Sequence, residues 1–108
     1  MGKTVYTSDG RYEWDETKSE LNKQKHGFTF EEILEVFDDP YILTQYDIAH
    51  SADEDRYWSI GSINGVLVIV VYYTERDGRT RIISARQAES ALQEVYNGYV
   101  AKINGGTN

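Results

Sequence analysis

Two hairpin turns within residues 56–86 constrain the fold of this chain more than any other feature. Asn64-Gly65 and Asp77-Gly78 each separate runs of β-branched and aromatic residues. Asn-Gly and Asp-Gly supply the two positive-φ positions of a type I′ turn, whose twist matches that of the flanking strands. We therefore predict three antiparallel strands in succession, at about residues 56–63, 66–75 and 79–86.

The middle strand is predicted to be buried on both faces. Residues 66–73 are apolar on both alternations, whereas a strand with one wet face alternates between apolar and polar residues. This strand is therefore expected at the centre of the sheet, with helices on at least one face.

Two-residue loops would also fix the register of the three strands, with Ile63 opposite Val66 at the first turn. Arg56 and Arg86 then share a face, two strands and four positions apart, on the order of 15 Å from strand geometry. The complete set predicted for that face is Arg56, Trp58, Ile60, Ile69, Val71, Tyr73, Ile82, Ser84 and Arg86.

The N-terminal part of the chain predicts a short strand at residues 11–14, followed by a polar helix. Asp15 suits the N-cap of this helix and Gly27 suits its C′ position, after Lys25 and His26. Because this helix has few apolar residues, we expect it to serve for the side chains that it presents.

A second helix is predicted from a capping box formed by Thr29 and Glu32, and Asp38-Asp39-Pro40 ends it. Residues 41–47 are typical of an edge strand. The last helix has an amphipathic stripe that would cover one sheet face: Ala88, Ala91, Leu92, Val95, Tyr96, Tyr99 and Ile103.

These elements predict an α+β fold in one domain of residues 1–108. An antiparallel sheet with a three-strand meander would be accompanied by two N-terminal helices and a C-terminal helix. Residues 1–11 and 104–108 are expected to be flexible.

Composition excludes several kinds of site. The chain has no Cys, which removes disulfides, thiolate metal sites and thiol nucleophiles, and its two His and scattered carboxylates have no metal-ligand spacing. The net charge of −7 argues against a broad nucleic-acid-binding surface, although five of the six arginines lie within residues 56–86.

No segment resembles a signal peptide or a membrane span, so we expect a cytoplasmic protein without membrane contact.

Few residues suggest chemistry. His26, at a helix end, is either a proton-transfer group or a histidine that interacts with the last carbonyls. His50, in an acidic loop, is interpreted as a surface residue. Arg56 and Arg86 lie in half-buried strands, where a guanidinium is either paired or used to bind an anion such as phosphate. Arg81 could instead pair across the sheet with a carboxylate.

Several motifs, in order over residues 12–96, resemble the BrnT family of bacterial type II toxins. They are Tyr12-Glu-Trp-Asp15, Lys18, Asn22, Lys25-His26-Gly27, Phe30, Glu32, Val36-Phe37, Asp39-Pro40, Glu54-Asp-Arg56-Tyr57, Ile60-Gly61, Leu67-Val-Ile-Val70, Arg81-Ile-Ile-Ser-Ala-Arg86 and Ala88.

This resemblance implies a fold like that of the RelE ribonucleases and an endoribonuclease that needs no metal or cofactor. It also implies neutralisation by a BrnA antitoxin. The antitoxin would bind DNA, whereas the toxin itself would not. In such an enzyme the ribose 2′-hydroxyl would attack the adjacent phosphate. The resemblance assigns acid–base chemistry to His26, phosphate binding to Arg56 and Arg86, and RNA positioning to Lys25, Tyr57 and Arg81.

One segment departs from the family pattern. Residues 88–93 read Ala-Glu-Ser-Ala-Leu-Gln, where the family has a basic run containing a Glu, and Leu92 occupies the Glu position. Lost positive charge would weaken RNA binding. Two alternatives therefore stay open: a weak or inactive module that binds an antitoxin and acts in operon regulation, and a small α+β domain with another role.

Overall fold

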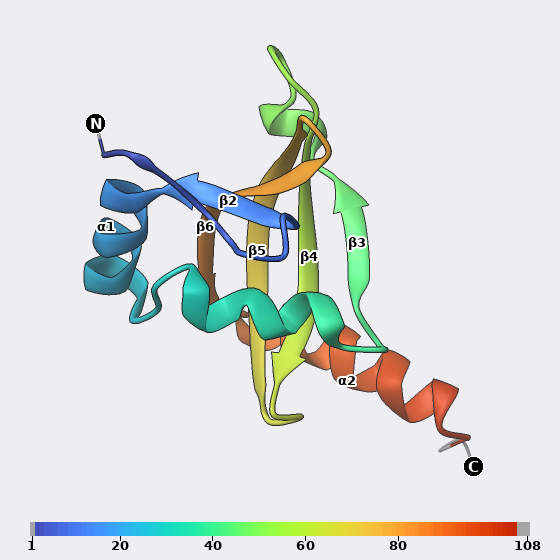
Figure 1. The fold of residues 1–108 in the computed structure, drawn as a ribbon. Coiled ribbons are helices and arrows are strands. Elements are labelled where there is room, and N and C mark those ends of the chain that lie inside the picture. Colours follow the sequence, from blue (N-terminus) through green and yellow to red (C-terminus); the bar gives the residue numbers. More distant parts are fainter. Residues whose placement is uncertain (1, 106–108) are drawn as a thin grey trace.

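A six-stranded sheet organises the chain, and the computed structural model describes residues 2–105 (Figure 1). The strands lie side by side in the order β1-β2-β6-β5-β4-β3. Their bounds are Thr4–Tyr6 (β1), Tyr12–Asp15 (β2), Leu43–Tyr46 (β3), Arg56–Ile63 (β4), Leu67–Arg76 (β5) and Arg79–Gln87 (β6). The α-helices are α1 (Glu16–His26) and α2 (Ser90–Ile103), and the 3₁₀ helices are η1 (Glu31–Asp38) and η2 (Ile48–His50).

The α+β class is confirmed, but the sheet is mixed and the prediction of an antiparallel sheet is wrong. β4, β5 and β6 pair in sequence, each antiparallel to its neighbour, and β3 lies at the edge. β2, however, pairs parallel with β6 through Glu13 and Arg81. The pairing of β2 with β6 joins segments that are distant in the sequence, so no turn motif predicts it. The N-terminal residues expected to be flexible include β1, which pairs antiparallel with β2.

The first hairpin is shifted by one residue from the predicted register. Asn64 and Gly65 both have positive φ, as expected for the turn, but Val66 stays outside the pairing and is 83% exposed. Ile63 therefore lies opposite Leu67. The β4 residues on the face of Arg56 consequently share it with Val68, Val70, Tyr72 and Thr74, rather than with Ile69, Val71 and Tyr73.

A β-bulge at Ile83 shifts the second hairpin as well. Tyr73 lies opposite Ile82 as predicted, but Tyr72 lies opposite Ser84, which leaves Ile83 as the extra residue of β6. Arg86 then faces Val70. Because both shifts are of one residue, Arg56 and Arg86 still share a face, four positions apart along β5.

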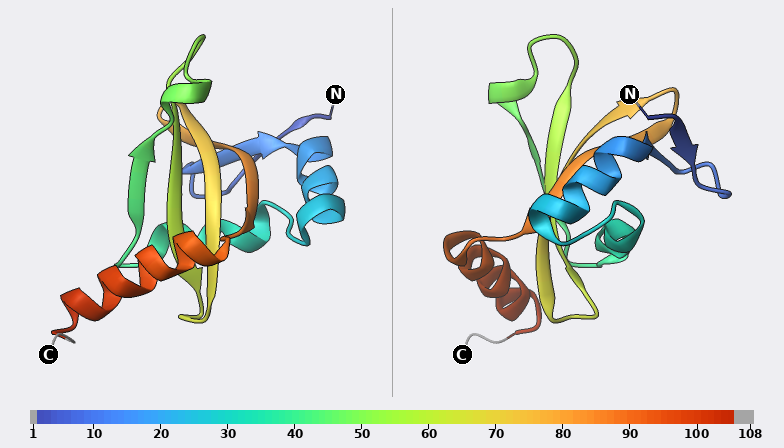
Figure 2. Two further views of the ribbon diagram at one scale, coloured as in Figure 1. Left: turned by 180° about the vertical axis from the view of Figure 1, so that it is seen from behind. Right: turned by 90° about the vertical axis from the view of Figure 1, so that its left-hand side faces the viewer.

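η1 and α2 lie on opposite faces of the sheet (Figure 2), and an apolar cluster lies on each face. The cluster on the η1 face consists of Tyr12, Trp14, Phe30, Ile33, Val36, Ile69, Val71, Tyr73, Ile82 and Ala85. On the other face, α2 and the sheet bury Ile60, Val68, Val70, Ala88 and Tyr96.

The predicted second helix is a 3₁₀ helix, and its capping box is present. The Thr29 N–H donates to Glu32 Oε1 at 2.8 Å, and the Glu32 N–H donates to Thr29 Oγ1 at 3.3 Å. With three residues per turn, Ile33 and Val36 fall on one face and both are fully buried. η1 approaches β4 so closely that a Cβ at Gly61 would lie 2.9 Å from the Val36 carbonyl oxygen. Only glycine fits there without displacing backbone.

The Asp39 carboxylate joins the end of η1 to β4 and α2. It accepts hydrogen bonds from the Tyr96 hydroxyl, the Ser62 N–H and the Tyr41 N–H. Burial acts to raise the pKa of Asp39, but these hydrogen bonds outweigh it and hold the pKa below its ordinary value.

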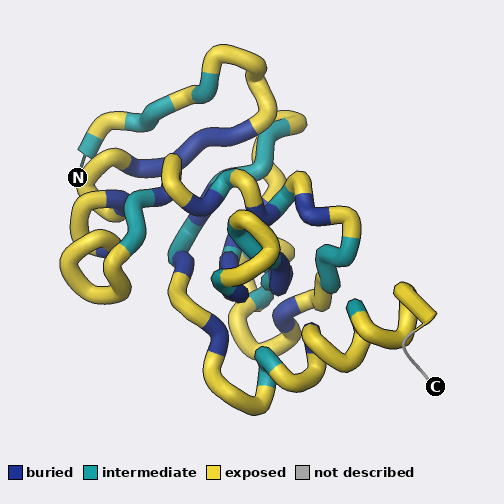
Figure 3. The backbone as a smooth tube through the Cα atoms, turned by 90° about the horizontal axis from the view of Figure 1, so that it is seen from below, coloured by how far each residue is buried: buried dark blue, intermediate teal, exposed yellow. Residues whose placement is uncertain are grey.

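α2 covers the sheet with only part of its predicted stripe. Tyr96 is buried and Leu92 is half-buried, whereas Val95, Tyr99 and Ile103 are exposed. Most of α2 is exposed in Figure 3. The helix projects away from the sheet toward its C-terminal end (Figure 2). Residues 106–108 of the predicted flexible tail lie outside the described residues.

Candidate functional site

A cavity of about 260 Å³ lies on the α2 face of the sheet, beside the part that α2 covers. Side chains from the end of α1, the η2 segment and strands β4, β5 and β6 surround it. They are His26, Asp47, His50, Arg56, Tyr72, Ile83, Ser84 and Arg86. Three of them, His26, Arg56 and Arg86, are predicted from the sequence and lie far apart in the chain, and the fold brings them to this one cavity.

The position of His26 follows from how α1 begins and is attached to β6. The Asp15 side chain accepts from the Lys18 N–H at 3.0 Å, and Gly27 ends the helix at a φ of 88°. Buried Asn22 then donates to the Ala85 carbonyl at 2.9 Å and accepts from the Ala85 N–H at 3.1 Å. Its side chain thus pairs with β6 as a neighbouring strand would, and it sets the C-terminal turn of α1 beside Ser84 and Arg86.

The two arginines line the cavity from different strands, Arg56 from β4 and Arg86 from β6. Their offset of four positions along β5 is as predicted, and Tyr72 and Ser84 line the cavity together with them. The Arg86 guanidinium lies 5.9 Å from the centre of the Tyr72 ring, and its Nη2 contacts the Tyr72 hydroxyl at 3.4 Å. Arg56 lies 3.9 Å from a Glu54 oxygen in a partly exposed pair, so this contact holds it weakly.

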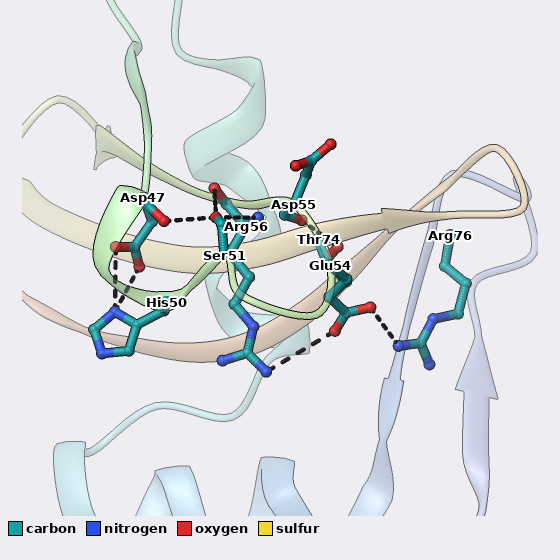
Figure 4. A network of polar contacts seen from close by, with 8 residues as sticks. All are labelled: Asp47, His50, Ser51, Glu54, Asp55, Arg56, Thr74 and Arg76. Atoms are coloured by element: carbon teal, nitrogen blue, oxygen red, sulfur yellow. Dashed lines mark hydrogen bonds and ion pairs between the residues drawn. The ribbon is translucent and has the colours of Figure 1, made fainter.

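The contacts of the η2 segment are not predicted from the sequence (Figure 4). His50 is a surface residue, as the sequence indicates, with a side chain that is 66% exposed, but its Nδ1 also hydrogen-bonds the largely buried Asp47 carboxylate at 2.9 Å. The Asp-x-x-His spacing within one helical turn was the available signal. No pattern in the sequence pointed to Tyr72 or Ser84.

The three residues expected to position RNA lie outside this cavity. Lys25 lines an adjoining hollow of about 190 Å³ that shares His26 and Ser84 with it. Arg81 pairs with Glu13 at 2.6 Å, as its cross-sheet alternative predicted, and lines another hollow of about 140 Å³ that shares Arg56. Tyr57 lies on the opposite face of the sheet, stacked on Tyr73 with ring centres 5.8 Å apart.

The cavity combines groups that move protons with groups that bind anions. Imidazole exchanges protons near neutral pH, and guanidinium binds phosphate through several hydrogen bonds. Within residues 2–105, no group of three or more His, Asp or Glu is arranged to hold a metal ion. No helix in that range is long and apolar enough to cross a membrane.

The chain is similar to known proteins over more than two thirds of its length. Residues 14–91 match the family model described as "Ribonuclease toxin, BrnT, of type II toxin-antitoxin system". The crystal structure of the Brucella abortus ribonuclease toxin BrnT is similar, with a TM-score of 0.56 and 30% sequence identity over 71% of this chain and 94% of that chain. No curated protein sequence matches. Because the family model spans more than half of the chain, the protein belongs to the BrnT family of ribonuclease toxins of type II toxin–antitoxin systems.

Proposed function

We propose that this BrnT protein is an active, metal-independent endoribonuclease. The observation that carries the proposal is the convergence of His26, Arg56 and Arg86 on one cavity. In the reaction, the ribose 2′-hydroxyl attacks the adjacent phosphorus and the bond to the 5′-oxygen breaks. The products are a 2′,3′-cyclic phosphate and a free 5′-hydroxyl.

Each of the three residues has a role that fits its position. His26, at the end of α1, transfers a proton to or from a ribose oxygen. Arg56 and Arg86 stabilise the negative charge that grows on the phosphoryl oxygens. Because the two arginines are offset by four positions along β5, they contact neighbouring phosphates of one RNA strand more readily than a single phosphate.

The adjoining hollows extend this cavity along the strand. One hollow includes Lys18 and Lys25 and the other includes Arg76 and Arg81. The hollows bring further positive side chains next to the cavity, although Glu54 pairs with Arg76, Glu13 pairs with Arg81, and the chain as a whole carries a net charge of −7. We propose that Lys25 and Arg81 contact RNA phosphates there. Tyr57 is the weakest of the predicted RNA contacts, since it lies on the other face.

The test is incubation of purified protein with total RNA in EDTA, beside His26→Ala and Arg56→Ala, with mapping of the product ends. We expect wild-type cleavage that leaves cyclic phosphates, and a loss of about 10²–10⁴-fold in rate for His26→Ala without loss of fold. Cleavage that needs a divalent ion, or that persists in both variants, would contradict the proposal.

The second candidate function is an antitoxin-binding module with little activity. The observation that favours it is the exposed outer stripe of α2, formed by Val95, Tyr99 and Ile103, in the helix that lacks the basic run of the family. Folded wild-type protein that cleaves no RNA but binds a basic antitoxin would support this module instead.

We also propose that the neutralising partner is a BrnA-like DNA-binding antitoxin. The protein would act in the bacterial cytoplasm, where its RNA substrate lies. We propose, third, that its fold is similar to that of the RelE ribonucleases. The family relationship supports the first two, and the order of helices and strands supports the third.

A further inference from the structure

The proposed cleavage needs two proton transfers, and His26 accounts for only one of them. A base must accept the proton of the 2′-hydroxyl, and an acid must protonate the departing 5′-oxygen. The chain has two histidines, His26 and His50, and both line the same cavity. The second histidine therefore lies where the missing group is required.

His50 is held in place by a short network that also fixes Arg56 (Figure 4). The Asp47 N–H donates to the Arg56 carbonyl at 2.8 Å and closes the loop between β3 and β4. The Ser51 hydroxyl donates to the Asp47 carbonyl at 2.6 Å and accepts from the Arg56 N–H at 2.9 Å. Since His50 follows Asp47 by one helical turn, the segment that carries its ring is fixed to the backbone of Arg56 by one set of contacts.

The Asp47 carboxylate also selects the tautomer of His50. It accepts a hydrogen bond from Nδ1, so the neutral ring carries its proton on Nδ1 and leaves the lone pair on Nε2 free. Asp47 is one-tenth exposed and His50 is two-thirds exposed, so the pair is anchored inside while the ring reaches solvent. An exposed ring with a free lone pair, oriented by a buried carboxylate, is the arrangement that a general base requires.

We propose that His50 is the general base of the reaction and His26 its general acid, an inference that rests on the proposed ribonuclease function. His50 Nε2 takes the proton of the 2′-hydroxyl as the 2′-oxygen bonds to phosphorus. The bond from phosphorus to the 5′-oxygen breaks, and the 5′-oxygen takes a proton from the His26 imidazolium. Asp47 is a positioning residue that does not touch the substrate.

The charged and titratable groups that face His50 come from every neighbouring element. They are Asp47 from its own segment, His26 from α1, Arg56 from β4, Tyr72 from β5 and Arg86 from β6. The two arginines bind phosphate in this scheme, which leaves the two imidazoles to transfer the protons. A reaction that uses one general base and one general acid depends on pH as a bell, and loss of the base removes its acidic limb.

The experiment compares His50→Asn with His26→Gln on an oligoribonucleotide that the wild type cleaves. The amide introduced by His50→Asn can still donate to Asp47 in place of Nδ1, so the loop is retained while Nε2 is removed. Both variants should lose about 10²–10⁴-fold in rate, with circular dichroism and thermal unfolding unchanged. His50→Asn should also lose the acidic limb of the pH–rate profile.

A substrate with a bridging sulfur at the 5′-position separates the two roles, because a thiolate leaves without protonation. This substrate should restore cleavage by His26→Gln to nearly the wild-type rate and should not restore cleavage by His50→Asn. The assignment of the base falls if His50→Asn cleaves at the wild-type rate, keeps the acidic limb or is rescued by the sulfur substrate. Wild-type protein that cleaves no RNA would instead overturn the ribonuclease function itself, and this assignment with it.

Discussion

The α2 face of the sheet has two halves that are formed by the same strands but differ in burial. In the half under α2, Ile60, Val68 and Val70 are at most 5% exposed. In the other half, Arg56, Tyr72 and Arg86 surround the open cavity. The two halves meet within single strands: Val70 lies under α2 and Tyr72, two positions along β5, lines the cavity.

This difference separates stability from chemistry over a short distance. Each buried aliphatic side chain of the covered half contributes about 1.5–3 kcal/mol to folding. In the open half, cationic and titratable side chains are accessible to solvent. Exposed ion pairs between such side chains contribute little to the free energy of folding. Substitutions in the open half should therefore change activity, and those in the covered half should change stability.

The largest expected effect comes from the open half. Arg86→Ala should lower the rate of RNA cleavage by about 10²–10³-fold, because one donor to the developing phosphoryl charge is lost. Arg79→Ala is the matched control on the same strand, since Arg79 lies over the Tyr6 ring, 4.9 Å from its centre, outside the cavity. Single-turnover cleavage assays measure both, and equal losses in the two variants would contradict the separation.

A smaller effect, on stability alone, is expected in the covered half. Ile60→Ala removes a side chain that is 1% exposed beneath α2 and should lower the free energy of unfolding by about 3 kcal/mol. Urea denaturation measures this loss. Cleavage per folded molecule should stay at the wild-type value, and a large fall in that value would show that the two halves are coupled.

The smallest effect concerns pH and the Asp39 network. Because the pKa of Asp39 is lowered in the fold, its carboxylate stabilises the protein above the ordinary pKa of about 4, and this contribution is lost as pH falls through the lower folded value. Asp39→Asn should cost about 1–2 kcal/mol at pH 7 and flatten the decline of stability below about pH 4. Thermal unfolding across that range provides the measurement, and an unchanged slope would count against the network.

Local patterns predicted the elements of this fold well, and long-range pairing poorly. Asp15, Gly27 and the capping box at Thr29 act within a few residues, and each forms the contacts expected from sequence. The parallel contact between β2 and β6 depends on the packing of the whole chain. No local sequence motif predicts the bulge at Ile83. Together with the unpaired Val66, this bulge determines which β5 side chains share a face with the arginines.

The candidate site was predictable only in part, for a related reason. His26, Arg56 and Arg86 were named because an imidazole at a helix end and guanidiniums in half-buried strands are unusual, and the family resemblance strengthened them. His50 lies in an acidic loop, and such a loop indicates a solvent-exposed side chain without a role. Its significance depends on the Ser51 and Asp47 contacts that turn the loop toward the cavity.

The Asn22 clamp has a consequence for biosynthesis. It joins residues 63 positions apart, and the cavity likewise draws on side chains from His26 to Arg86. A ribosome makes these segments in order, so a nascent chain that has not yet released β6 has neither the clamp nor the complete cavity. Translation products that end before Ala85 would therefore lack the assembled site, and any RNA cleavage would need a chain that extends past Arg86.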